Sequence, residues 1–376
     1  MLNGYKVSDV DLHVVEPGDL WLKRIDPAFR DLAPRPVNVF DDANASYPRM
    51  MVAGTVVNKT AGNNRLSPLL VRQQRENMNR WYGDLIKMGW TPQAQILGMD
   101  RAGIDVGFLF GSLGINVLCN DEVMPDLAVA IARAYNDWLG DFTSHNRDRL
   151  KHVAVMPMQD PQGAVEEVRR CAKSYKTCGV IARGEPHNGR TIDDPAYDVL
   201  WSELERLNLA LGIHITSGSI LPTLGAHRFK TRFQSHTVSH PMEQMASMVA
   251  LIGSGVLERH PKLRVAFLES GGGWLPYMLW RLDEQYEQQT FEAPHLKMKP
   301  SDYFKRQCWI SVESDEPNIK AVAEAVGEDR LVISSDFPHA DHEPGGLKRF
   351  ADRGDLSDSL KRKTLWDNTM RFYGLT

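Results

Sequence analysis

Asp11 and His13 stand two residues apart in segment 7–16, whose valine and leucine residues favour a β-strand. On an extended backbone, side chains two positions apart leave from the same face. A carboxylate and an imidazole that lie side by side are two of the ligand types that bind divalent metal ions. Such a pair can also be a surface aspartate and a buried, hydrogen-bonded histidine, so a metal site requires further ligands from elsewhere in the chain.

Other polar side chains stand where apolar runs end. His214 follows LALGI, Glu269 follows LRVAFL and Asp336 follows RLVISS. Burying several ionisable groups together is costly unless they have partners. A divalent cation would remove the imbalance, because two aspartates neutralise its charge and two histidines add neutral nitrogen donors. The predicted ligand set is Asp11, His13, His214 and Asp336.

These side chains require a fold that brings distant strand ends together. Eight short apolar runs alternate with helical patterns, as in a parallel sheet that is buried on both faces. Eight such units predict an α/β fold of the closed (β/α)8 TIM-barrel type, whose functional residues lie at the carboxyl ends of the strands. An open, doubly wound sheet is the alternative, but no glycine-rich phosphate loop follows the first run. The runs are 7–16, 105–110, 149–158, 178–185, 209–215, 263–270, 308–314 and 330–341.

Segment 17–95, between the first two runs, is too long for a simple loop. It is rich in proline, asparagine, aspartate and glycine, and its pattern predicts a helix near residues 70–87. Such insertions are commonly lids or binding elements, and Trp81, Tyr82 and Trp90 would then wall a pocket. A helical cap that only packs on the barrel is an equally good interpretation. We expect one domain, 1–376, with 17–95 as insertion and 96–376 as the remainder of the barrel.

The composition excludes several classes of protein. The chain is 42% hydrophobic and 24% charged, which is typical of a globular protein and not of a disordered one. A net charge of −4 with both signs scattered argues against nucleic acid as a partner. The sequence shows no secretory signal and no apolar run of membrane-spanning length, so we expect a cytoplasmic protein without a membrane partner. The scattered cysteines are then expected to be reduced, buried thiols: Cys119, Cys171, Cys178 and Cys308.

The chain resembles the decarboxylase-like branch of the amidohydrolase superfamily, which includes aminocarboxymuconate semialdehyde decarboxylase and γ-resorcylate decarboxylase. The matching segments are VDLHVVE, GIHI, PKLRVAFLESGGGWLPYMLWRLDE and ISSDFPHAD. The resemblance implies a barrel that holds one Zn²⁺ or Mn²⁺ ion and forms a dimer or larger homo-oligomer. It also implies ligands from an acidic-or-His-x-His pair on the first strand, a histidine ending the fifth and an aspartate ending the eighth. By resemblance these are again Asp11, His13, His214 and Asp336.

Two positions depart from the family pattern. Many members have histidine where this chain has Asp11, and the oxygen-rich set favours Mn²⁺ or Mg²⁺ over the Zn²⁺ of a histidine-rich site, although Zn²⁺ also fits. The resemblance also implies a catalytic histidine at the end of the sixth strand of the decarboxylases. This chain has Glu269 at that position. Either Glu269 is itself the acid or base, or the chemistry differs from theirs.

The favoured function is metal-dependent, non-oxidative decarboxylation of a small aromatic or unsaturated carboxylic acid. The metal would bind the substrate carboxylate and a neighbouring oxygen, while Asp336 protonates the carbon as CO₂ departs and Glu269 assists. The alternative is a hydrolase of an amide, ester or C–C ketone, in which a metal-bound water is the nucleophile and Asp336 or Glu269 its base. A non-catalytic barrel used for binding is a third hypothesis, and it predicts no metal in the purified protein.

Four further polar residues have two interpretations each. Arg183 can clamp a substrate carboxylate or hold a loop in place. His339, three residues after Asp336, can orient a ligand or contact the substrate. Glu16 can reach the site or form a salt bridge. For His240, which begins a predicted helix, a structural role is favoured.

Overall fold

A computed structural model describes residues 1–40, 46–57, 68–118, 120–121, 123–214, 224–225, 228–339 and 344–376. Cys119 lies outside the described residues, as do the last residues of the predicted fifth and eighth runs. The other three cysteines are buried and form no disulfide. No helix in the described ranges is both long and apolar enough to cross a membrane.

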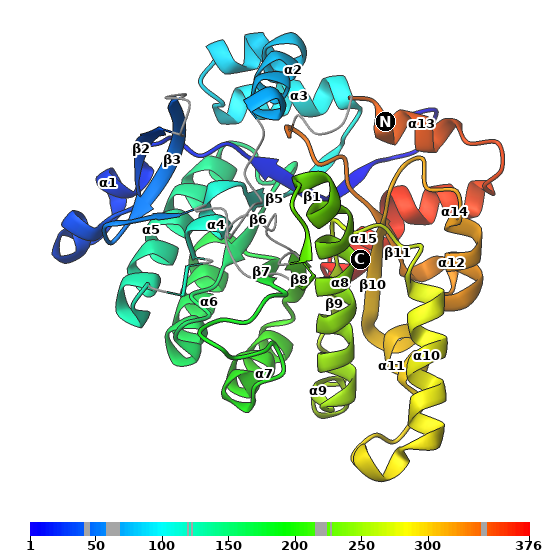
Figure 1. Cartoon of the computed structure of the whole chain (residues 1–376). Coiled ribbons are helices and arrows are strands. Elements are labelled where there is room, and N and C mark those ends of the chain that lie inside the picture. Colours follow the sequence, from blue (N-terminus) through cyan, green and yellow to red (C-terminus); the bar gives the residue numbers. More distant parts are fainter. Residues whose placement is uncertain are drawn as a thin grey trace.

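All eight predicted strands are present and form one parallel sheet at the centre of the molecule (Figure 1). Each strand pairs with the next one in the barrel, and their residues are almost all buried. This is the pattern expected when helices cover the outer face of a parallel sheet. The strands are β1 (Ser8–Val14), β5 (Val106–Gly111), β6 (Leu150–Val155), β7 (Gly179–Arg183), β8 (Ala210–His214), β9 (Val265–Phe267), β10 (Cys308–Val312) and β11 (Leu331–Ile333).

The last strand returns to the first and nearly closes the barrel. The His13 amide donates to the Phe337 carbonyl at 2.9 Å, and the Ser334 hydroxyl donates to the Asp11 carbonyl at 2.6 Å. These bonds lie just beyond β11, so the segment that carries Asp336 is fastened directly to the strand that carries Asp11 and His13. The predicted TIM-barrel fold is confirmed.

Helices between the strands surround the sheet (Figure 1). Aspartate side chains cap two of them: Asp194 caps the short Pro195–Tyr197 helix that leads into α7, and Asp160 accepts a hydrogen bond from the Gly163 amide at the start of α6. The principal helices are α4 (Leu113–Leu118), α5 (Pro125–Ser144), α6 (Pro161–Tyr175), α7 (Asp198–Leu207), α8 (Arg232–Gly253), α9 (Val256–Arg259), α10 (Leu275–Gln288), α11 (Pro300–Gln307), α12 (Ile319–Val326), α13 (Gly346–Asp352), α14 (Asp358–Arg362) and α15 (Asn368–Phe372).

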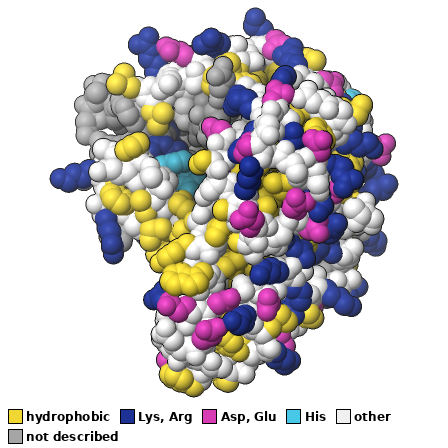
Figure 2. All heavy atoms as spheres, turned by 90° about the vertical axis from the view of Figure 1, so that its right-hand side faces the viewer, with side chains coloured by type: hydrophobic (Ala, Val, Ile, Leu, Met, Phe, Trp, Pro, Cys, Tyr) yellow, Lys and Arg dark blue, Asp and Glu magenta, His cyan; other side chains and the backbone are white. Residues whose placement is uncertain are grey.

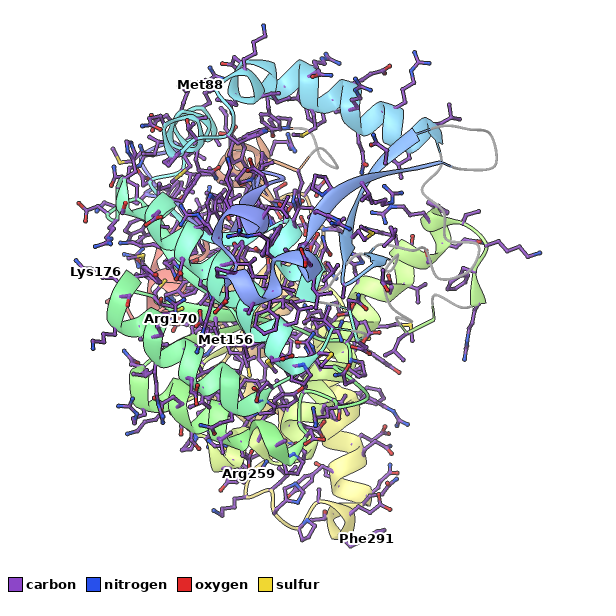
Figure 3. The ribbon with its side chains drawn as sticks, turned by 90° about the vertical axis from the view of Figure 1, so that its left-hand side faces the viewer. Met88, Met156, Arg170, Lys176, Arg259 and Phe291 are labelled. Atoms are coloured by element: carbon purple, nitrogen blue, oxygen red, sulfur yellow. The ribbon has the colours of Figure 1, made fainter. Side chains whose placement is uncertain are left out.

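The insertion has more regular structure than its composition predicts. The expected helix is present as α2 (Pro68–Lys87), and α3 (Pro92–Ala102) follows it. A small antiparallel sheet of β2 (Arg35–Phe40), β3 (Ser46–Val52) and β4 (Thr55–Val57) comes after α1 (Leu20–Arg24). Figure 3 shows Met88, which follows α2, at the opposite end of the molecule from Phe291, which follows α10. The helices α2 and α3 of the insertion therefore lie at one end of the molecule (Figure 1).

Candidate metal centre

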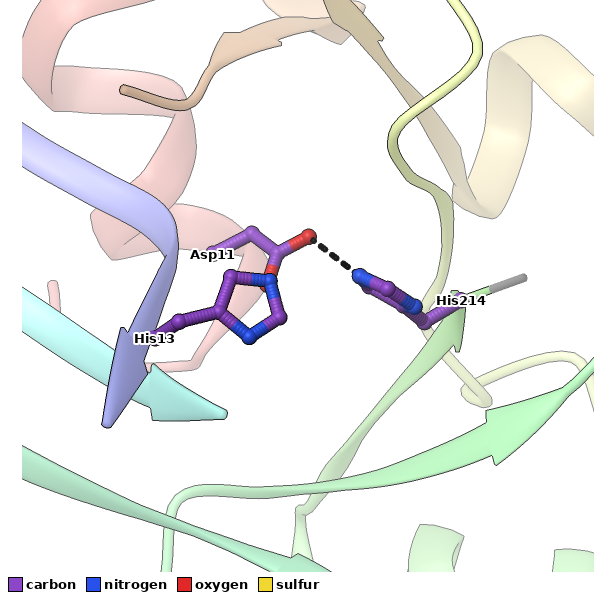
Figure 4. A group of neighbouring side chains, drawn as sticks. All are labelled: Asp11, His13 and His214. Carbon is purple, nitrogen blue, oxygen red and sulfur yellow. Dashed lines mark ion pairs between the residues drawn. The ribbon is translucent and has the colours of Figure 1, made fainter. Parts of the chain in front are cut away.

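Three of the predicted ligands meet at the carboxyl ends of β1 and β8 (Figure 4). Nε2 of His214 lies 3.4 Å from Oδ2 of Asp11, and Nε2 of His13 lies 3.6 Å from Oδ1 of Asp11. All three side chains are buried. Asp11 and His13 therefore share a face of β1, as their spacing predicts, and His214 reaches them from the far side of the barrel.

The fourth predicted ligand reaches the same place from the segment after β11. Oδ1 of Asp336 lies 3.4 Å from Nε2 of His13 and 2.7 Å from Nδ1 of His339. His339 therefore contacts one proposed ligand directly and also lines the cavity, so its geometry is compatible with both of its interpretations.

Glu269 belongs to the same cluster. Glu269 lies two residues beyond the end of β9. Its Oε2 atom is 2.9 Å from Nε2 of His214. Glu269 and Asp336 both have left-handed backbones, with φ of 54° and 55°. This conformation is uncommon for residues other than glycine and persists only where the surrounding structure enforces it, often at functional sites. Two carboxylates are thus held in the barrel mouth by strained backbone.

The cluster contains more negative charge than its histidines can offset. Burial, together with the nearby Glu269 and Asp336 carboxylates, raises the pKa of Asp11 to about 8, although His214 acts to lower it. Burial alone would lower the pKa of His214, but Asp11 and Glu269 raise it to about 10. Burial also opposes ionisation of Glu269, yet His214 holds its pKa below the usual range. Burial, with His339 and His214 nearby, keeps the pKa of His13 well below its usual value.

These residues fit a divalent cation. Among the described residues, Oδ1 of Asp11 and both ring nitrogens of His13 have no hydrogen-bond partner, although all three atoms are buried. Buried polar atoms are normally satisfied, so groups of this kind indicate an ion or water. Asp11, His13 and His214 offer one ligand atom each, all within 4.8 Å of one another. A mixed set of carboxylate oxygens and imidazole nitrogens suits Mn²⁺ or Zn²⁺ and can accommodate Mg²⁺.

Buried hydrogen bonds hold the first strand in position. Nε2 of Gln95, on the insertion helix α3, donates to the His13 carbonyl at 3.0 Å. Asp9 accepts hydrogen bonds from the amide and hydroxyl of Ser335. The insertion and the loop after β11 therefore both fix β1, which carries half of the proposed ligands.

The cluster opens into a cavity of about 1010 Å³. Figure 2 shows histidine side chains gathered in a hollow of one face, beside hydrophobic side chains. Among the predicted aromatic residues of the insertion, Trp81 and Tyr82 line the cavity, and Trp90 packs against Tyr82 and Phe337 behind it. The cavity therefore combines an aromatic wall with a carboxylate-rich floor that includes Asp11, Glu269 and Asp336.

Arg183 lies outside this group. Its buried guanidinium is 2.7 Å from Oδ1 of Asp121 and also donates to the Pro186 carbonyl, and it is not among the described residues that line the cavity. These contacts support the loop-holding interpretation, since the Nη2 atom of the guanidinium already donates to two groups of the protein. Substrate binding by Arg183 has no support from this geometry.

Glu16 and His240 have different surroundings. Glu16 is buried and accepts hydrogen bonds from the Leu113 and Gly114 amides at 2.7 to 3.0 Å, so it holds the start of α4, and it forms no salt bridge with any described residue. Burial raises its pKa to about 7. His240 lies within α8 and not at its start, lines the cavity, and stacks near His236 with ring centroids 4.0 Å apart.

Two contributors to the site escaped sequence reasoning. Ser112 contacts His339, and Gln95 holds His13. Ser112 directly follows the second barrel strand, so the same strand-end rule that found His214 points to it. Gln95 lies on a helix of the insertion and carries no such signal.

An eight-stranded parallel barrel with its polar cluster at the carboxyl ends of the strands defines a TIM-barrel enzyme. The amidohydrolase family matches residues 9–375. The chain therefore belongs to the amidohydrolase family.

Two relatives of known name are decarboxylases. The chain is 26% identical over 289 residues to 2-amino-3-carboxymuconate-6-semialdehyde decarboxylase of Dictyostelium discoideum, which is 76% of this chain and 77% of that protein. It is 28% identical over 257 residues to γ-resorcylate decarboxylase of Rhizobium sp. strain MTP-10005, covering 64% of this chain and 74% of that protein. The resemblance inferred from the sequence is confirmed.

Solved structures share the fold. An amidohydrolase from Mycobacterium avium subsp. paratuberculosis superimposes with a TM-score of 0.78 and 20% identity over 99% of this chain and 100% of that one. A dihydroxybenzoic acid decarboxylase from Polaromonas sp. JS666, solved with manganese and the inhibitor 2-nitroresorcinol, gives a TM-score of 0.65 at 18% identity, covering 100% and 98%. At these identities the similarity establishes the fold.

Proposed function

We propose that this protein is a metal-dependent, non-oxidative decarboxylase of a small aromatic or unsaturated carboxylic acid. The observation that carries the proposal is the convergence of Asp11, His13, His214 and Asp336, from three distant segments, beside an aromatic-walled cavity. Asp11 and His214 share one candidate metal-binding group with His13, and Asp336 shares a second with His13 and His339. The named decarboxylase relatives support it. In this proposal the four residues hold one divalent cation, with Mn²⁺ favoured by the oxygen-rich set, Zn²⁺ compatible and Mg²⁺ possible.

When bound, the cation would supply Lewis acidity and a fixed anchor for the substrate carboxylate and a neighbouring oxygen. The protein's own residues then orient the ring and supply a proton. The C–C bond to the carboxylate breaks, its electron pair stays on the ring carbon, and that carbon takes one proton as CO₂ leaves. Asp336 is the proposed donor and Glu269 assists the transfer. Trp81 and Tyr82 would shield the ring from water.

A hydrolase remains the second candidate because of Glu269. A carboxylate that is held beside His214 by strained backbone suits a base that takes a proton from an attacking water. In that case Glu269 or Asp336 would be the base and the substrate an amide, ester or C–C ketone.

One panel of assays separates the candidates. Purified protein loaded with Mn²⁺ or Zn²⁺ is incubated with hydroxybenzoates and, separately, with small amides and esters, while CO₂, amine and acid release are followed. Decarboxylation predicts CO₂ release that stops with a chelator and returns with metal. Amine or acid release without CO₂ would support the hydrolase, and failure with both classes contradicts both. Elemental analysis of the protein as isolated tests the non-catalytic hypothesis, which predicts no metal.

Two properties of the whole molecule complete the proposal. We propose a cytoplasmic location, which agrees with buried cysteines that form no disulfide. We also propose a homo-oligomer, a dimer or larger, by analogy with the family. Size-exclusion chromatography with light scattering would contradict the homo-oligomer if it gave the mass of one 42.4 kDa chain.

A further inference from the structure

A short chain of contacts leads from Ser112 to the proposed metal site. Oγ of Ser112 lies 3.0 Å from Nε2 of His339, and Nδ1 of the same ring lies 2.7 Å from Oδ1 of Asp336. A carboxylate can only accept at Nδ1, so that nitrogen carries a proton. At Nε2 the Ser112 hydroxyl can accept from a protonated ring or donate to a neutral one, so the contact orients the ring in either state.

The His339 ring also touches a second proposed ligand. It stacks on the His13 ring with centroids 4.0 Å apart and an interplanar angle of 28°. A rotation of His339 would therefore disturb both the carboxylate of Asp336 and the imidazole of His13. The hydrogen bond with Ser112 adds a contact at Nε2, on the other ring nitrogen from the one that meets Asp336.

The position of Ser112 is itself fixed. It directly follows β5, whose Gly111 pairs with Val14 of β1. Nδ2 of Asn116 donates to the Ser112 carbonyl at 2.6 Å. The carboxylate of Glu16, just beyond β1, accepts from the Leu113 and Gly114 amides that come next. Ser112 therefore sits between β5 and α4, with the residue before it paired to β1 and the two residues after it bonded to Glu16, just beyond β1.

We infer that Ser112 is a positioning residue of the metal centre: its hydroxyl fixes the orientation of the His339 ring, which in turn orients Asp336 and His13. The inference rests on the metal site of the proposed function. Groups that orient metal ligands in this way commonly change metal affinity by about 10- to 100-fold when they are removed. The effect must pass through His339, because Ser112 is not among the described residues that meet the ligands themselves.

The order Asp336–His339–Ser112 also matches that of a nucleophilic triad, and the surrounding amides argue against this alternative. A serine nucleophile needs backbone N–H groups that are available to stabilise an oxyanion. The two amides that follow Ser112 are both bonded to the Glu16 carboxylate, which would repel an anion there. Ser112 thus orients His339 and does not attack substrate.

The first test measures Mn²⁺ affinity by competition with a chelator, in the absence of any substrate. We expect Ser112→Ala to bind Mn²⁺ about tenfold more weakly or worse, and Ser112→Thr, which keeps the hydroxyl, to stay within about threefold of wild type. Ser254→Ala is the matched control, because Ser254 Oγ bonds only a helix carbonyl at 2.7 Å far from the site. Equal affinity in wild type and Ser112→Ala, or equal loss in Ser112→Ala and Ser112→Thr, would overturn the inference.

The second test asks whether the effect passes through His339. In the double variant Ser112→Ala/His339→Ala, we expect no further loss of affinity beyond His339→Ala alone. The visible absorption of the Co²⁺-loaded protein should differ between wild type and Ser112→Ala while the unfolding midpoint of the metal-free protein stays the same. Additive losses or identical Co²⁺ spectra would refute the role. A wild-type protein that binds no metal would refute the proposed function as well, whereas binding without decarboxylation leaves this inference standing.

Discussion

Glu269 and His214 form a buried pair, with Oε2 of Glu269 2.9 Å from Nε2 of His214. The same nitrogen lies 3.4 Å from Asp11, so it is the atom that the proposed ligand set requires. A metal at this site would replace the proton that His214 shares with Glu269. Glu269 must then either join the ligands or turn toward the substrate, and these two roles have different consequences when its charge is removed.

Glu269→Gln should abolish turnover while the metal stays bound. The amide preserves the shape of the side chain but cannot give or accept the proton, and loss of a general acid or base typically costs about 10²- to 10⁴-fold in kcat. We expect metal stoichiometry by elemental analysis to remain near that of wild type. Glu287→Gln, an exposed residue on α10 paired with Lys299, serves as control and should change neither quantity. Loss of metal together with activity would instead identify Glu269 as a ligand.

Metal removal should destabilise the protein as well as inactivate it. Without a cation, His214 offsets the mutual repulsion of Asp11, Glu269 and Asp336 only in part. A ligand that binds only the folded state stabilises it by about 2.7 kcal/mol at a hundredfold excess over Kd. The unfolding temperature should therefore fall with a chelator and recover with Mn²⁺. In His214→Ala the chelator should have little effect, because the site is already incomplete. An unchanged midpoint in the wild type would contradict the proposed site.

The strand ends could be read from the sequence because each ionisable residue there interrupts or ends an apolar run. His214 and Glu269 stand out for that reason, and the barrel then dictates that they meet. Asp11 and His13 needed only the alternation of a strand to share a face. The eight strands and the ligand cluster were therefore predictable from local pattern, because a (β/α)8 barrel brings the carboxyl ends of all its strands to one face.

The remaining features depend on contacts between segments that local pattern does not describe. Arg183 ends a strand as His214 does, yet it pairs with Asp121, which comes from a turn 62 residues earlier. Glu16 accepts hydrogen bonds from backbone amides that lie about a hundred residues later in the sequence. The small sheet β2–β4 was missed because proline and asparagine within its segment obscure strand alternation. Such pairings are set by tertiary packing, which overrides local propensity.

Gly98→Ala, a substitution in the insertion, should displace Phe337 and so lower both activity and stability. Gly98 lies in α3, and a Cβ there would stand 2.2 Å from Cζ and 2.9 Å from Cε2 of Phe337. Phe337 adjoins Asp336 and packs edge-on against Tyr82, so its displacement would move both the ligand and the cavity wall. Overpacking of this kind costs about 1–3 kcal/mol, more than the roughly 1 kcal/mol that alanine gains over glycine in a helix. We expect lower kcat and a lower unfolding temperature.

Gly83→Ala is the matched control for this substitution. Gly83 lies in α2 of the same insertion, directly after a kink at Tyr82, and a Cβ at Gly83 would meet no atom of the other described segments within 4 Å. Helix propensity then acts alone, and stability should stay constant or rise by up to about 1 kcal/mol. If Gly98→Ala behaves like Gly83→Ala in activity and melting, α3 does not constrain the Asp336 segment.

Low pH should remove the contribution that the ion pairs of Glu203, on α7, make to the free energy of unfolding. Its buried carboxylate binds the Nε atoms of Arg169 and Arg206 at 2.8 and 3.0 Å, and these arginines lower its pKa to about 2. Because the folded pKa lies below the unfolded value of about 4.3, the contribution is full above pH 5 and disappears as pH falls toward 2. Both arginines are about half exposed, so solvent screening limits the contribution to about 1 kcal/mol.

Glu203→Gln isolates this contribution. The difference in unfolding free energy between wild type and Glu203→Gln, measured by urea denaturation, should be constant from pH 8 to about pH 5 and shrink steadily toward zero at lower pH. Glu166→Gln, whose carboxylate is exposed and 3.9 Å from Arg133, should show no comparable trend. A difference that stays constant down to pH 3 would mean that the amide loses packing or hydrogen bonds and that the charge of Glu203 contributes nothing.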